Sequence, residues 1–330
     1  MLLLPFAGCS LFEDCYPLNI KSWSATKKSG GTLNLISEVD SSMKLKFLVI
    51  PAIVIPVAVG VIPFLIGLIF SFTDWNLTVP GVHFIGIQNY IEILRDSSFW
   101  EAVLVTIEFT GLAVGIEMLL GSFVAFLLSR NVRGQWFFRS IILIPLTVAP
   151  VLSALMWKLM LAPTGGVINY LLGFLGMPNV AWLSNPSTSL LSLVVIDVYI
   201  NTPFVALLVF AGIQSLPLEP YEAAQVDGAS GWFVFKSLTL PMLKPILILA
   251  LVFRLILSLK TFDIIYATTR GGPAALTTNL HLWSYINSFQ YGAIGYSMTG
   301  AAILFIMIFA LSMWLIKVWS RSVSYMTSSQ

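Results

Sequence analysis

The sequence predicts an all-α, polytopic membrane protein with six transmembrane helices. Hydrophobic residues make up 58% of the 330 residues and charged residues only 10%, whereas a soluble domain contains about 25% charged residues. The mean hydropathy is accordingly high, at +0.91. Six apolar windows reach the roughly 20 residues that a helix needs to cross the hydrocarbon core of a bilayer. They cover residues 47–73, 102–128, 136–162, 188–213, 238–262 and 294–319.

Two tails flank the predicted six-span domain, which we place at residues 43–320. Residues 1–42 are interpreted as a cytoplasmic N-terminal tail that is either disordered or an extension of the gene model. The reason is that Met43 stands directly before the first apolar window and is followed by Lys44 and Lys46, which makes it a more natural start. Residues 321–330 are interpreted as a cytoplasmic C-terminal tail.

Lysine and arginine residues collect on one side of the predicted helices. Cytoplasmic loops of membrane proteins are enriched in these residues, so the asymmetry predicts the orientation of the chain. The opposite side carries Arg95 and Arg270, with Lys158 near its border. Both termini and the loop at 217–237 are therefore predicted to be cytoplasmic. The basic side carries Lys21, Lys27, Lys28, Lys44, Lys46, Arg130, Arg133, Arg139, Lys236, Lys244, Lys317 and Arg321.

The rest of the composition argues against several classes of function. The net charge is only +2 and the sequence has no basic tract, which argues against a nucleic-acid partner. Cys9 and Cys15 are the only cysteines, and His83 and His281 lie far apart, so no metal site is indicated. The sequence also lacks a Gly-x-x-x-x-Gly-Lys-Ser/Thr loop, which would cradle nucleotide phosphates.

The segment 217–237 is a polar interruption between the fourth and fifth apolar windows. Pro217 and Pro220 close the fourth window and stand where a new helix can begin, since the missing N–H of proline is not needed there. The next residues, 218–226, have the pattern of a short amphipathic helix. Gly228 is suited to the left-handed conformation that ends a helix. We therefore expect a first short helix along the membrane surface.

A second short helix is expected immediately after the first. Ser230 can cap its N-terminus, the helix would run to Ser237, and Leu240 with Pro241 would then begin the fifth span. On the first helix, Ala223 and Ala224 have small side chains, which would leave a shallow face for a partner to press into.

This segment resembles a known family motif. Glu222-Ala223-Ala224 is followed by three residues, Gly228, nine residues, Leu238, one residue and Leu240-Pro241. The spacing is similar to the EAA loop of binding-protein-dependent ABC importer permeases, although that family usually has Ile at the position of Leu238. Further on, residues 262–266 and Gly271-Gly272-Pro273 resemble the carbohydrate branch, in its maltose/trehalose/glycerol-phosphate-like first permease subunits. The resemblance covers about residues 45–320.

The resemblance implies a type I ABC importer permease fold and a non-catalytic role in sugar import. In that family the EAA loop docks on a dimer of ATPase subunits, which bind ATP and Mg²⁺, so this chain would bind no cofactor itself. The other implied partners are a second homologous permease, an extracytoplasmic sugar-binding protein, membrane lipid and the sugar. The implied location is the prokaryotic inner membrane. The implied coupling residues are Glu219, Glu222, Ala223, Ala224, Asp227 and Gly228.

Ionisable residues inside apolar windows are costly and therefore suggest function. Asp197 lies nine residues from the predicted outer end of the fourth window and Arg254 eight residues from that of the fifth. At 1.5 Å per residue these depths are about 14 and about 12 Å, so the two side chains are expected to form an ion pair. The pair would either only hold two helices together or take part in gating and substrate contact.

The second window carries two further acidic residues. Glu108 and Glu117 are nine residues apart, which places them on opposite faces of one helix, so they are not expected to act as a carboxylate pair. Glu117 is expected to meet a polar neighbour and is assigned no role. Gly111 and Gly115 form a Gly-x-x-x-Gly element, a weak signal for close helix contact with another span or with another subunit.

Polar and aromatic residues near the ends of the fourth and fifth windows are candidates for a sugar pathway. Sugars present alternating hydroxyl groups and C–H patches, and amides, hydroxyls, carboxylates and aromatic faces complement both. The resemblance places sugar contacts on the same late spans. The alternative is a snorkelling lysine with interfacial aromatic residues. The candidates are Asn201, Thr202, Lys260, Thr261, Phe262, Asp263 and Tyr266.

Two other functional classes were weighed against the importer. An ion-gradient-driven secondary transporter could use Asp197, Glu108 and Glu117 as an ion pathway, but it predicts internal inverted repeats, and the two halves of the sequence show no convincing repeat. An intramembrane enzyme would need a nucleophile with its base, or metal ligands, at membrane depth. Neither His83 nor His281 falls within an apolar window.

Overall fold

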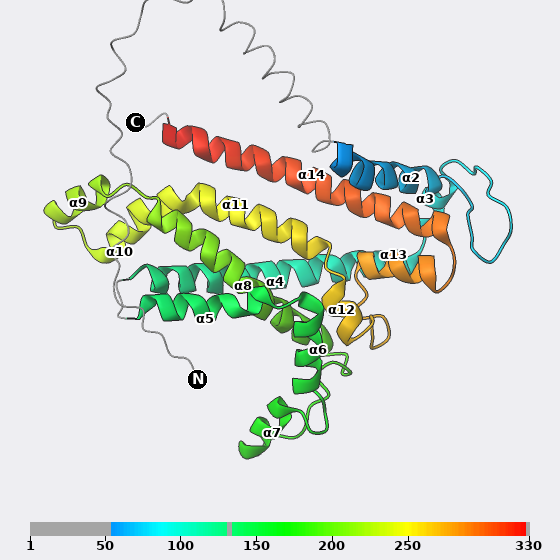
Figure 1. The fold of residues 1–330 in the computed structure, drawn as a ribbon, viewed down its shortest axis with the longest axis horizontal. Coiled ribbons are helices and arrows are strands. Elements are labelled where there is room, and N and C mark those ends of the chain that lie inside the picture. Colours follow the sequence, from blue (N-terminus) through cyan, green and yellow to red (C-terminus); the bar gives the residue numbers. More distant parts are fainter. Residues whose placement is uncertain (1–53, 131–133, 328–330) are drawn as a thin grey trace, which may run out of the picture. The chain divides into compact units, whose positions relative to one another are not determined.

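The computed structural model describes residues 54–130 and 134–327, and these residues are almost entirely helical (Figure 1). Two isolated β-bridges, Thr73–Phe84 and Asn76–Val79, are the exceptions to helix and loop within those ranges. The chain divides into two units, Met1–Pro63 and Phe64–Gln330.

The described α-helices are α2 (Ile62–Phe70), α3 (Gln88–Ile93), α4 (Ser97–Ser129), α5 (Gln135–Thr147), α6 (Pro150–Met160), α7 (Val167–Phe174), α8 (Ser189–Gln214), α9 (Glu219–Val226), α10 (Gly231–Val234), α11 (Leu240–Leu259), α12 (Asp263–Thr268), α13 (Leu280–Phe289) and α14 (Ile294–Thr327).

Six spans were predicted, whereas the described residues supply four helices long and apolar enough to cross a bilayer, or five spans if the bent pair α5–α6 counts as one. Four described helices are long and apolar enough to cross a bilayer by themselves: Ser97–Ser129, Ser189–Gln214, Gly231–Leu259 and Ile294–Ser322. A shorter apolar helix, Val54–Phe70, covers part of the predicted first span and includes a π-helical turn at Val57–Val61. Residues 47–53 of that span and the whole of the predicted tail 1–42 lie outside the described residues.

The predicted third span is not one straight helix. It consists of α5 and α6, which meet at an angle of 95°. The break has a local cause, because Pro150 opens α6 and the residue before a proline is driven out of the helical conformation. Ala149 and Val148 are accordingly extended, with ψ angles of 134° and 135°. A hydropathy window reports apolar content and cannot detect this change in direction.

The predicted boundary between the second short helix and the fifth span is absent. Ser230 caps the helix as expected, since its Oγ accepts a hydrogen bond from the N–H of Phe233 at 3.3 Å. From Gly231 the chain then continues as one helix to Leu259, through a π-helical turn at Phe235–Thr239. This wider turn comes just before Pro241, whose missing N–H interrupts regular α-helical bonding. The second surface helix is therefore the first part of the fifth span.

Helix α4 packs against α8 and α11, and these three helices form the centre of the unit Phe64–Gln330. Gly121 on α4 allows the closest approach to α8, because a Cβ atom at this position would lie 2.6 Å from Cβ of Val205. Gly111 and Gly115, the expected contact element, have open space around them within the described chain. Within the described chain, the close contact thus comes from a single glycine six residues beyond Gly115.

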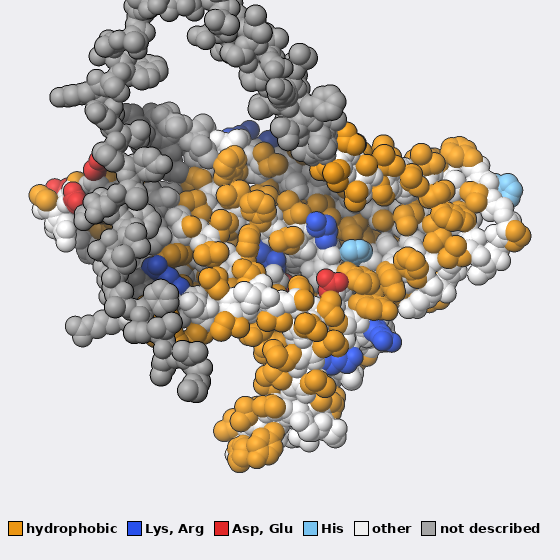
Figure 2. All heavy atoms as spheres, in the orientation of Figure 1, with side chains coloured by type: hydrophobic (Ala, Val, Ile, Leu, Met, Phe, Trp, Pro, Cys, Tyr) orange, Lys and Arg blue, Asp and Glu red, His pale blue; other side chains and the backbone are white. Residues whose placement is uncertain are grey.

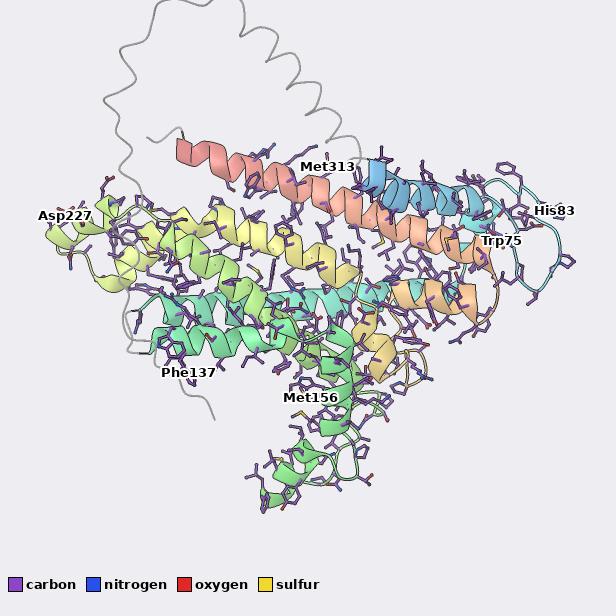
Figure 3. All side chains as sticks on the ribbon, viewed as in Figure 1. Trp75, His83, Phe137, Met156, Asp227 and Met313 are labelled. Carbon is purple, nitrogen blue, oxygen red and sulfur yellow. The ribbon has the colours of Figure 1, made fainter. Side chains whose placement is uncertain are left out.

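The two ends of this unit differ in character. Helices α9 and α10 lie at one end, whereas α3 and α13 lie at the other (Figure 1). Figure 3 shows Asp227 beside α9 and, at the opposite end, Trp75 and His83 in the loop that precedes α3. Between the ends, hydrophobic side chains cover most of the visible face over α6, α7, α11 and α14 (Figure 2). Many of them are exposed, as a lipid-facing surface requires.

Candidate functional site

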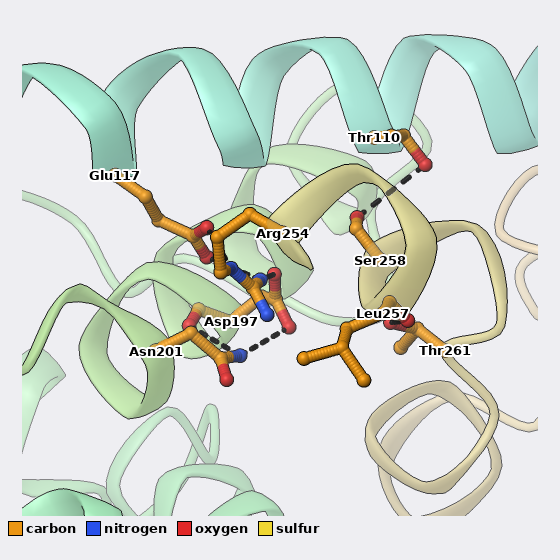
Figure 4. Close-up of polar contacts among 8 residues, drawn as sticks. All are labelled: Thr110, Glu117, Asp197, Asn201, Arg254, Leu257, Ser258 and Thr261. Atoms are coloured by element: carbon orange, nitrogen blue, oxygen red, sulfur yellow. Dashed lines mark hydrogen bonds and ion pairs between the residues drawn. The ribbon is translucent and has the colours of Figure 1, made fainter. Parts of the chain in front are cut away.

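A buried cluster of charged side chains joins the three central helices (Figure 4). Arg254 on α11 donates two hydrogen bonds to Glu117 on α4, one from Nε to Oε2 at 2.5 Å and one from Nη2 to Oε1 at 2.8 Å. The same Nη2 also donates to Oδ2 of Asp197 on α8, at 3.0 Å. The three side chains are 2%, 0% and 1% exposed. The arrangement therefore places a guanidinium between two carboxylates at membrane depth.

The structure thus brings Asp197 and Arg254 together, as predicted, and shows that the polar neighbour expected for Glu117 is Arg254. The sequence signal that could have indicated this contact is the spacing of residues along α4. Thr106, Thr110 and Ala113 precede Glu117 at intervals of three or four residues and are buried, while Glu108 is exposed on another face. A glutamate that continues such a face must have a partner, because an unpaired charge there would be prohibitively costly.

Asn201 extends the cluster towards a pocket. Its Nδ2 donates to Oδ1 of Asp197 at 2.9 Å and to the carbonyl oxygen of Asp197 at 3.1 Å, one helical turn earlier on α8. Both amide hydrogens are used in these two bonds, so the amide oxygen remains available to accept a hydrogen bond. Asn201 therefore links the buried charged cluster to the pocket that it lines.

The pocket has a volume of about 400 Å³ and lies between α8, the end of α11 and the start of α12. Five of the predicted sugar-pathway residues line it, namely Asn201, Lys260, Thr261, Phe262 and Asp263. Asp197 and Arg254 form part of the same wall, so the ion cluster and the predicted pathway are one site. The remaining lining residues are Pro150, Leu257, Ile264 and His281.

Two of the predicted pathway residues do not line this pocket. Tyr266 stands behind Phe262, with the ring centroids 5.1 Å apart and the planes nearly parallel at 15°. Thr202 is half-buried, and its Oγ1 has no hydrogen-bond partner within the described residues. Tyr266 thus supports the aromatic wall from behind, and the pocket-facing polar group on this turn of α8 is Asn201.

His281 on α13 is a pocket residue that the sequence reasoning missed. Its Nδ1 lies 2.9 Å from the carbonyl oxygen of Lys260, and its ring centroid lies 5.4 Å from that of Phe262. Asn279, the cap of α13, donates its side-chain amide to the carbonyl oxygen of Thr261. These contacts hold the turn between α11 and α12 in place and present Lys260, Thr261 and Phe262 to the pocket.

The EAA-like segment forms α9 and a left-handed turn at Gly228, whose φ is +70°. The N–H of Ala229 donates to the carbonyl oxygen of Ala224 at 2.9 Å, which closes this helix end as expected. Tyr221 fastens α9 to the following helix, since its hydroxyl donates to Oγ1 of Thr239 at 3.1 Å. The predicted helix and its glycine stop are both present.

The faces of α9 differ from the expectation at one residue. Ala224 is buried, with 9% exposure, and so it is not presented to a partner as predicted. A small residue at this position lets α9 lie close to the body of the protein. Ala223 is exposed, and so are the three acidic residues Glu219, Glu222 and Asp227. Large apolar side chains stand exposed beside them: Leu218 (72%), Val226 (88%), Trp232 (71%) and Phe233 (57%).

A metal site is not indicated by the geometry of the described residues, because they contain no group of three or more His, Cys, Asp or Glu side chains close enough to share an ion. Two basic side chains that do not line this pocket have contacts of their own. Lys158 donates to the carbonyl oxygen of Ala267 at 3.3 Å, and Arg270 lies over the ring of Tyr266 at 5.8 Å.

Comparison with known proteins identifies the family. Residues 117–325 match the model described as "Binding-protein-dependent transport system inner membrane component". The chain belongs to this permease family. The match begins at Glu117 and includes the ion cluster, the pocket and α9. This membership supports the importer over the ion-gradient-driven transporter that the sequence had left as an alternative.

Individual relatives cover most of the permease. It is 40% identical over 264 residues to the probable ABC transporter permease protein y4oQ of Sinorhizobium fredii, covering 79% of this chain and 85% of the relative. It is 38% identical over 240 residues to the trehalose/maltose transport system permease protein MalF of Thermococcus litoralis, covering 73% and 81%. The crystal structure of a bacterial ABC transporter for the acidic polysaccharide alginate shares the fold, with a TM-score of 0.75 at 21% identity, and covers 87% of this chain and 99% of that one.

Proposed function

We propose that this permease is one transmembrane subunit of an ATP-driven, binding-protein-dependent sugar importer and forms half of its translocation pathway. The observation that carries the proposal is the pocket between α8, α11 and α12. It combines an amide, a hydroxyl, a carboxylate and an aromatic face, supplied by Asn201, Thr261, Asp263 and Phe262, with a buried charged cluster behind them. Such a mixture of directional polar groups and an apolar surface is what a sugar requires.

The proposed substrate class is a di- or oligosaccharide such as trehalose or maltose. One relative of this chain carries the name of a trehalose/maltose permease, at 38% identity. The pocket volume of about 400 Å³ lies within the usual range for small-molecule sites, which is about 300–1,000 Å³. Phe262 offers an aromatic face to a sugar ring in the pocket, and the ring of Tyr266 stacks against Phe262 and supports it.

The proposed energy source is a separate ATPase dimer that binds ATP and Mg²⁺ and docks on α9. The exposed carboxylates of Glu219, Glu222 and Asp227 offer negative charge, and the exposed side chains of Leu218 and Val226 offer apolar contact. An exposed combination of this kind suits a protein partner better than it suits lipid or water alone. The other proposed partners are a second homologous permease and an extracytoplasmic sugar-binding protein.

The proposed location is a prokaryotic inner membrane, with α9 and both termini on the cytoplasmic side. The support is the positive-inside asymmetry, since Lys236, Lys244, Lys317 and Arg321 belong to the same side as α9 in the sequence pattern. A cysteine placed at the exposed position Ala223 should then react with a membrane-impermeant thiol reagent only from the cytoplasmic side.

Reconstitution tests the function directly. The permease, its partner permease, the ATPase and the binding protein from neighbouring genes are co-purified and placed in proteoliposomes. Uptake of radiolabelled trehalose and maltose is then measured with ATP on the side of α9. We expect uptake that requires both ATP and the binding protein. Uptake that follows an imposed proton or sodium gradient without ATP would overturn the proposal.

A further inference from the structure

Glu117 does not line the pocket, yet it sits at the start of a hydrogen-bonded chain that ends there. Its side chain is fully buried, and the pocket wall is formed by other residues. From Glu117 the chain of contacts passes to Arg254, from Arg254 to Asp197 and from Asp197 to Asn201. Figure 4 shows these four side chains in sequence, with Asn201 at the far end.

The first link in this chain is the most rigid. Glu117 accepts from both Nε and Nη2 of Arg254, and two parallel bonds fix the plane of a guanidinium as well as its distance. The second link is a single bond from Nη2 to Asp197. Without Glu117, Nε of Arg254 would lose its acceptor, and one bond to Asp197 would leave the guanidinium free to rotate about that contact.

The last link sets the direction of a pocket group. Asp197 Oδ1 accepts from the amide of Asn201, which holds the amide nitrogen towards the cluster and leaves the amide oxygen for the pocket. If the Asp197 side chain turned to follow a displaced Arg254, Asn201 would keep only its bond to the main-chain carbonyl oxygen of Asp197, and its amide would be held less firmly with the oxygen towards the pocket. The orientation of this pocket group therefore depends in part on a residue on another helix.

We propose that Glu117 is a positioning residue for the pocket, acting through Arg254 and Asp197 on the orientation of Asn201. This inference rests on the proposed function, because it assigns to Glu117 a part in sugar transport rather than in fold stability alone. If Glu117 only stabilised the helices, its substitution would change the amount of assembled transporter by the same factor whether or not Asn201 was present. If Glu117 positions Asn201, its substitution would have no further effect on transport once Asn201 had been replaced.

A double-mutant cycle separates these two roles. Glu117→Gln, Asn201→Ala and the double variant are reconstituted in the complete importer, and the rate of trehalose and maltose uptake per assembled complex is measured. We expect each single substitution to lower uptake about 10-fold and the double variant to lower it by about the same 10-fold, because the two residues act in series. A double variant near the product of the two effects, about 100-fold, would overturn the proposal.

Glu108→Gln is the matched control, since Glu108 is exposed on the same helix α4. It should leave uptake unchanged in the presence and in the absence of Asn201. If Glu117→Gln does not assemble, the same cycle is run with Glu117→Asp, which keeps the charge but withdraws the carboxylate from Arg254. Normal uptake by Glu117→Gln, or additive effects in the cycle with Glu117→Asp, would contradict the positioning role and leave the proposed function intact. A wild-type importer that moves neither sugar would contradict the proposed function as well.

Discussion

Arg254 and Glu117 are 137 residues apart in the sequence, and their side chains form a two-bond contact in the centre of the helix bundle, with a shortest distance of 2.5 Å. Asp197 shares the same guanidinium. One cation therefore serves two carboxylates, which has a direct consequence for stability. Removing the cation leaves two buried acidic groups that must each accept a proton or rearrange, whereas removing one acid leaves a simple ion pair.

Arg254→Met is accordingly expected to be the most destabilising substitution in the cluster. Breaking a buried charge pair from one side costs about 3–5 kcal/mol, because the remaining charge stays buried without a partner. Neutralising Asp197 along with Arg254 would not restore stability, since Glu117 would remain. The triple variant Arg254→Met, Glu117→Gln, Asp197→Asn should recover most of the loss. The melting temperatures of the purified complexes in detergent provide the measurement.

Lys260→Met is the control for the cluster experiment, since it removes an exposed cation from the edge of the same pocket. Its melting temperature should remain near that of the wild type. An Arg254→Met variant that melts no lower than Lys260→Met, or a triple variant no better than Arg254→Met, would show that the three charges do not depend on one another.

Gly121→Ala is expected to weaken the packing of α4 on α8. The added methyl group would lie 2.6 Å from Cβ and 2.7 Å from Cγ1 of Val205, a β-branched side chain with little freedom to move. Overpacking of this kind costs about 1–3 kcal/mol. Thermal unfolding of the variant, followed by the fluorescence of buried tryptophan such as Trp283, should show a clear decrease in melting temperature.

Gly115→Ala makes the same change at a position where the added Cβ atom would meet no atom of the described residues within 4 Å, apart from its own stretch of α4. Alanine is the better helix former by about 1 kcal/mol, so this variant should be neutral or slightly more stable as an isolated subunit. Equal destabilisation by the two substitutions would contradict the assignment of the close contact to Gly121. A loss of complex formation by Gly115→Ala alone would instead place this face against another subunit.

The sequence predicted the helices well where one helix corresponds to one uninterrupted apolar run. The window at 188–213 became α8 at Ser189–Gln214, and the expected surface helix at 218–226 became α9 at Glu219–Val226. The ends of α9 carry clear local signals, because Pro217 precedes it, Pro220 lies in its first turn and Gly228 follows it. Local residues alone determine these boundaries, so a reading of the sequence can find them.

The features that the sequence did not reveal depend on direction or on distant partners. The bend between α5 and α6 changes the direction of an apolar run without changing its composition. The buried position of Ala224 depends on how α9 lies against the rest of the chain. The contact of Glu117 with Arg254 could not be predicted, because the sequence does not show that α4 turns Glu117, and not Glu108, towards α11. Helical periodicity separated the two faces but did not identify what each one contacts.

Asp96 should stabilise the start of α4 and its contact with α14, and this stability should be lost in acid. It caps α4 by accepting from the N–H of Ser98 at 2.8 Å, and it accepts from the hydroxyl of Tyr296 at 2.8 Å. Partial burial favours the neutral carboxyl, but the hydrogen bonds from Tyr296 and Ser98 outweigh it and hold the pKa of Asp96 below its ordinary value of 3.8. A lowered pKa in the folded state means that this stabilisation is present above the unfolded pKa and disappears as pH falls through the folded pKa.

Asp96→Asn keeps the capping ability but removes the titrating group. The melting temperatures of wild type and variant, measured from pH 7 down to pH 3, should differ most at neutral pH and converge below the ordinary pKa of about 3.8. Tyr296→Phe should reduce the same difference, since it removes one of the hydrogen bonds. A difference that stays constant over the whole range would indicate that Asp96 contributes no pH-dependent stability.

Glu222→Lys should uncouple ATP hydrolysis from sugar uptake while leaving the permease folded and inserted. Glu222 is exposed on α9, so a lysine there disturbs no packing within the chain, but it reverses the charge offered to the proposed ATPase partner. Gln214→Lys introduces the same side chain at an exposed position on the end of α8, outside α9, and is the matched control. In proteoliposomes, Glu222→Lys should lower uptake per ATP hydrolysed at least about 10-fold, the factor that corresponds to 1.4 kcal/mol at the docking contact. Equal coupling in Glu222→Lys and wild type, or an equal loss in Gln214→Lys, would show that this carboxylate does not connect α9 to the ATPase.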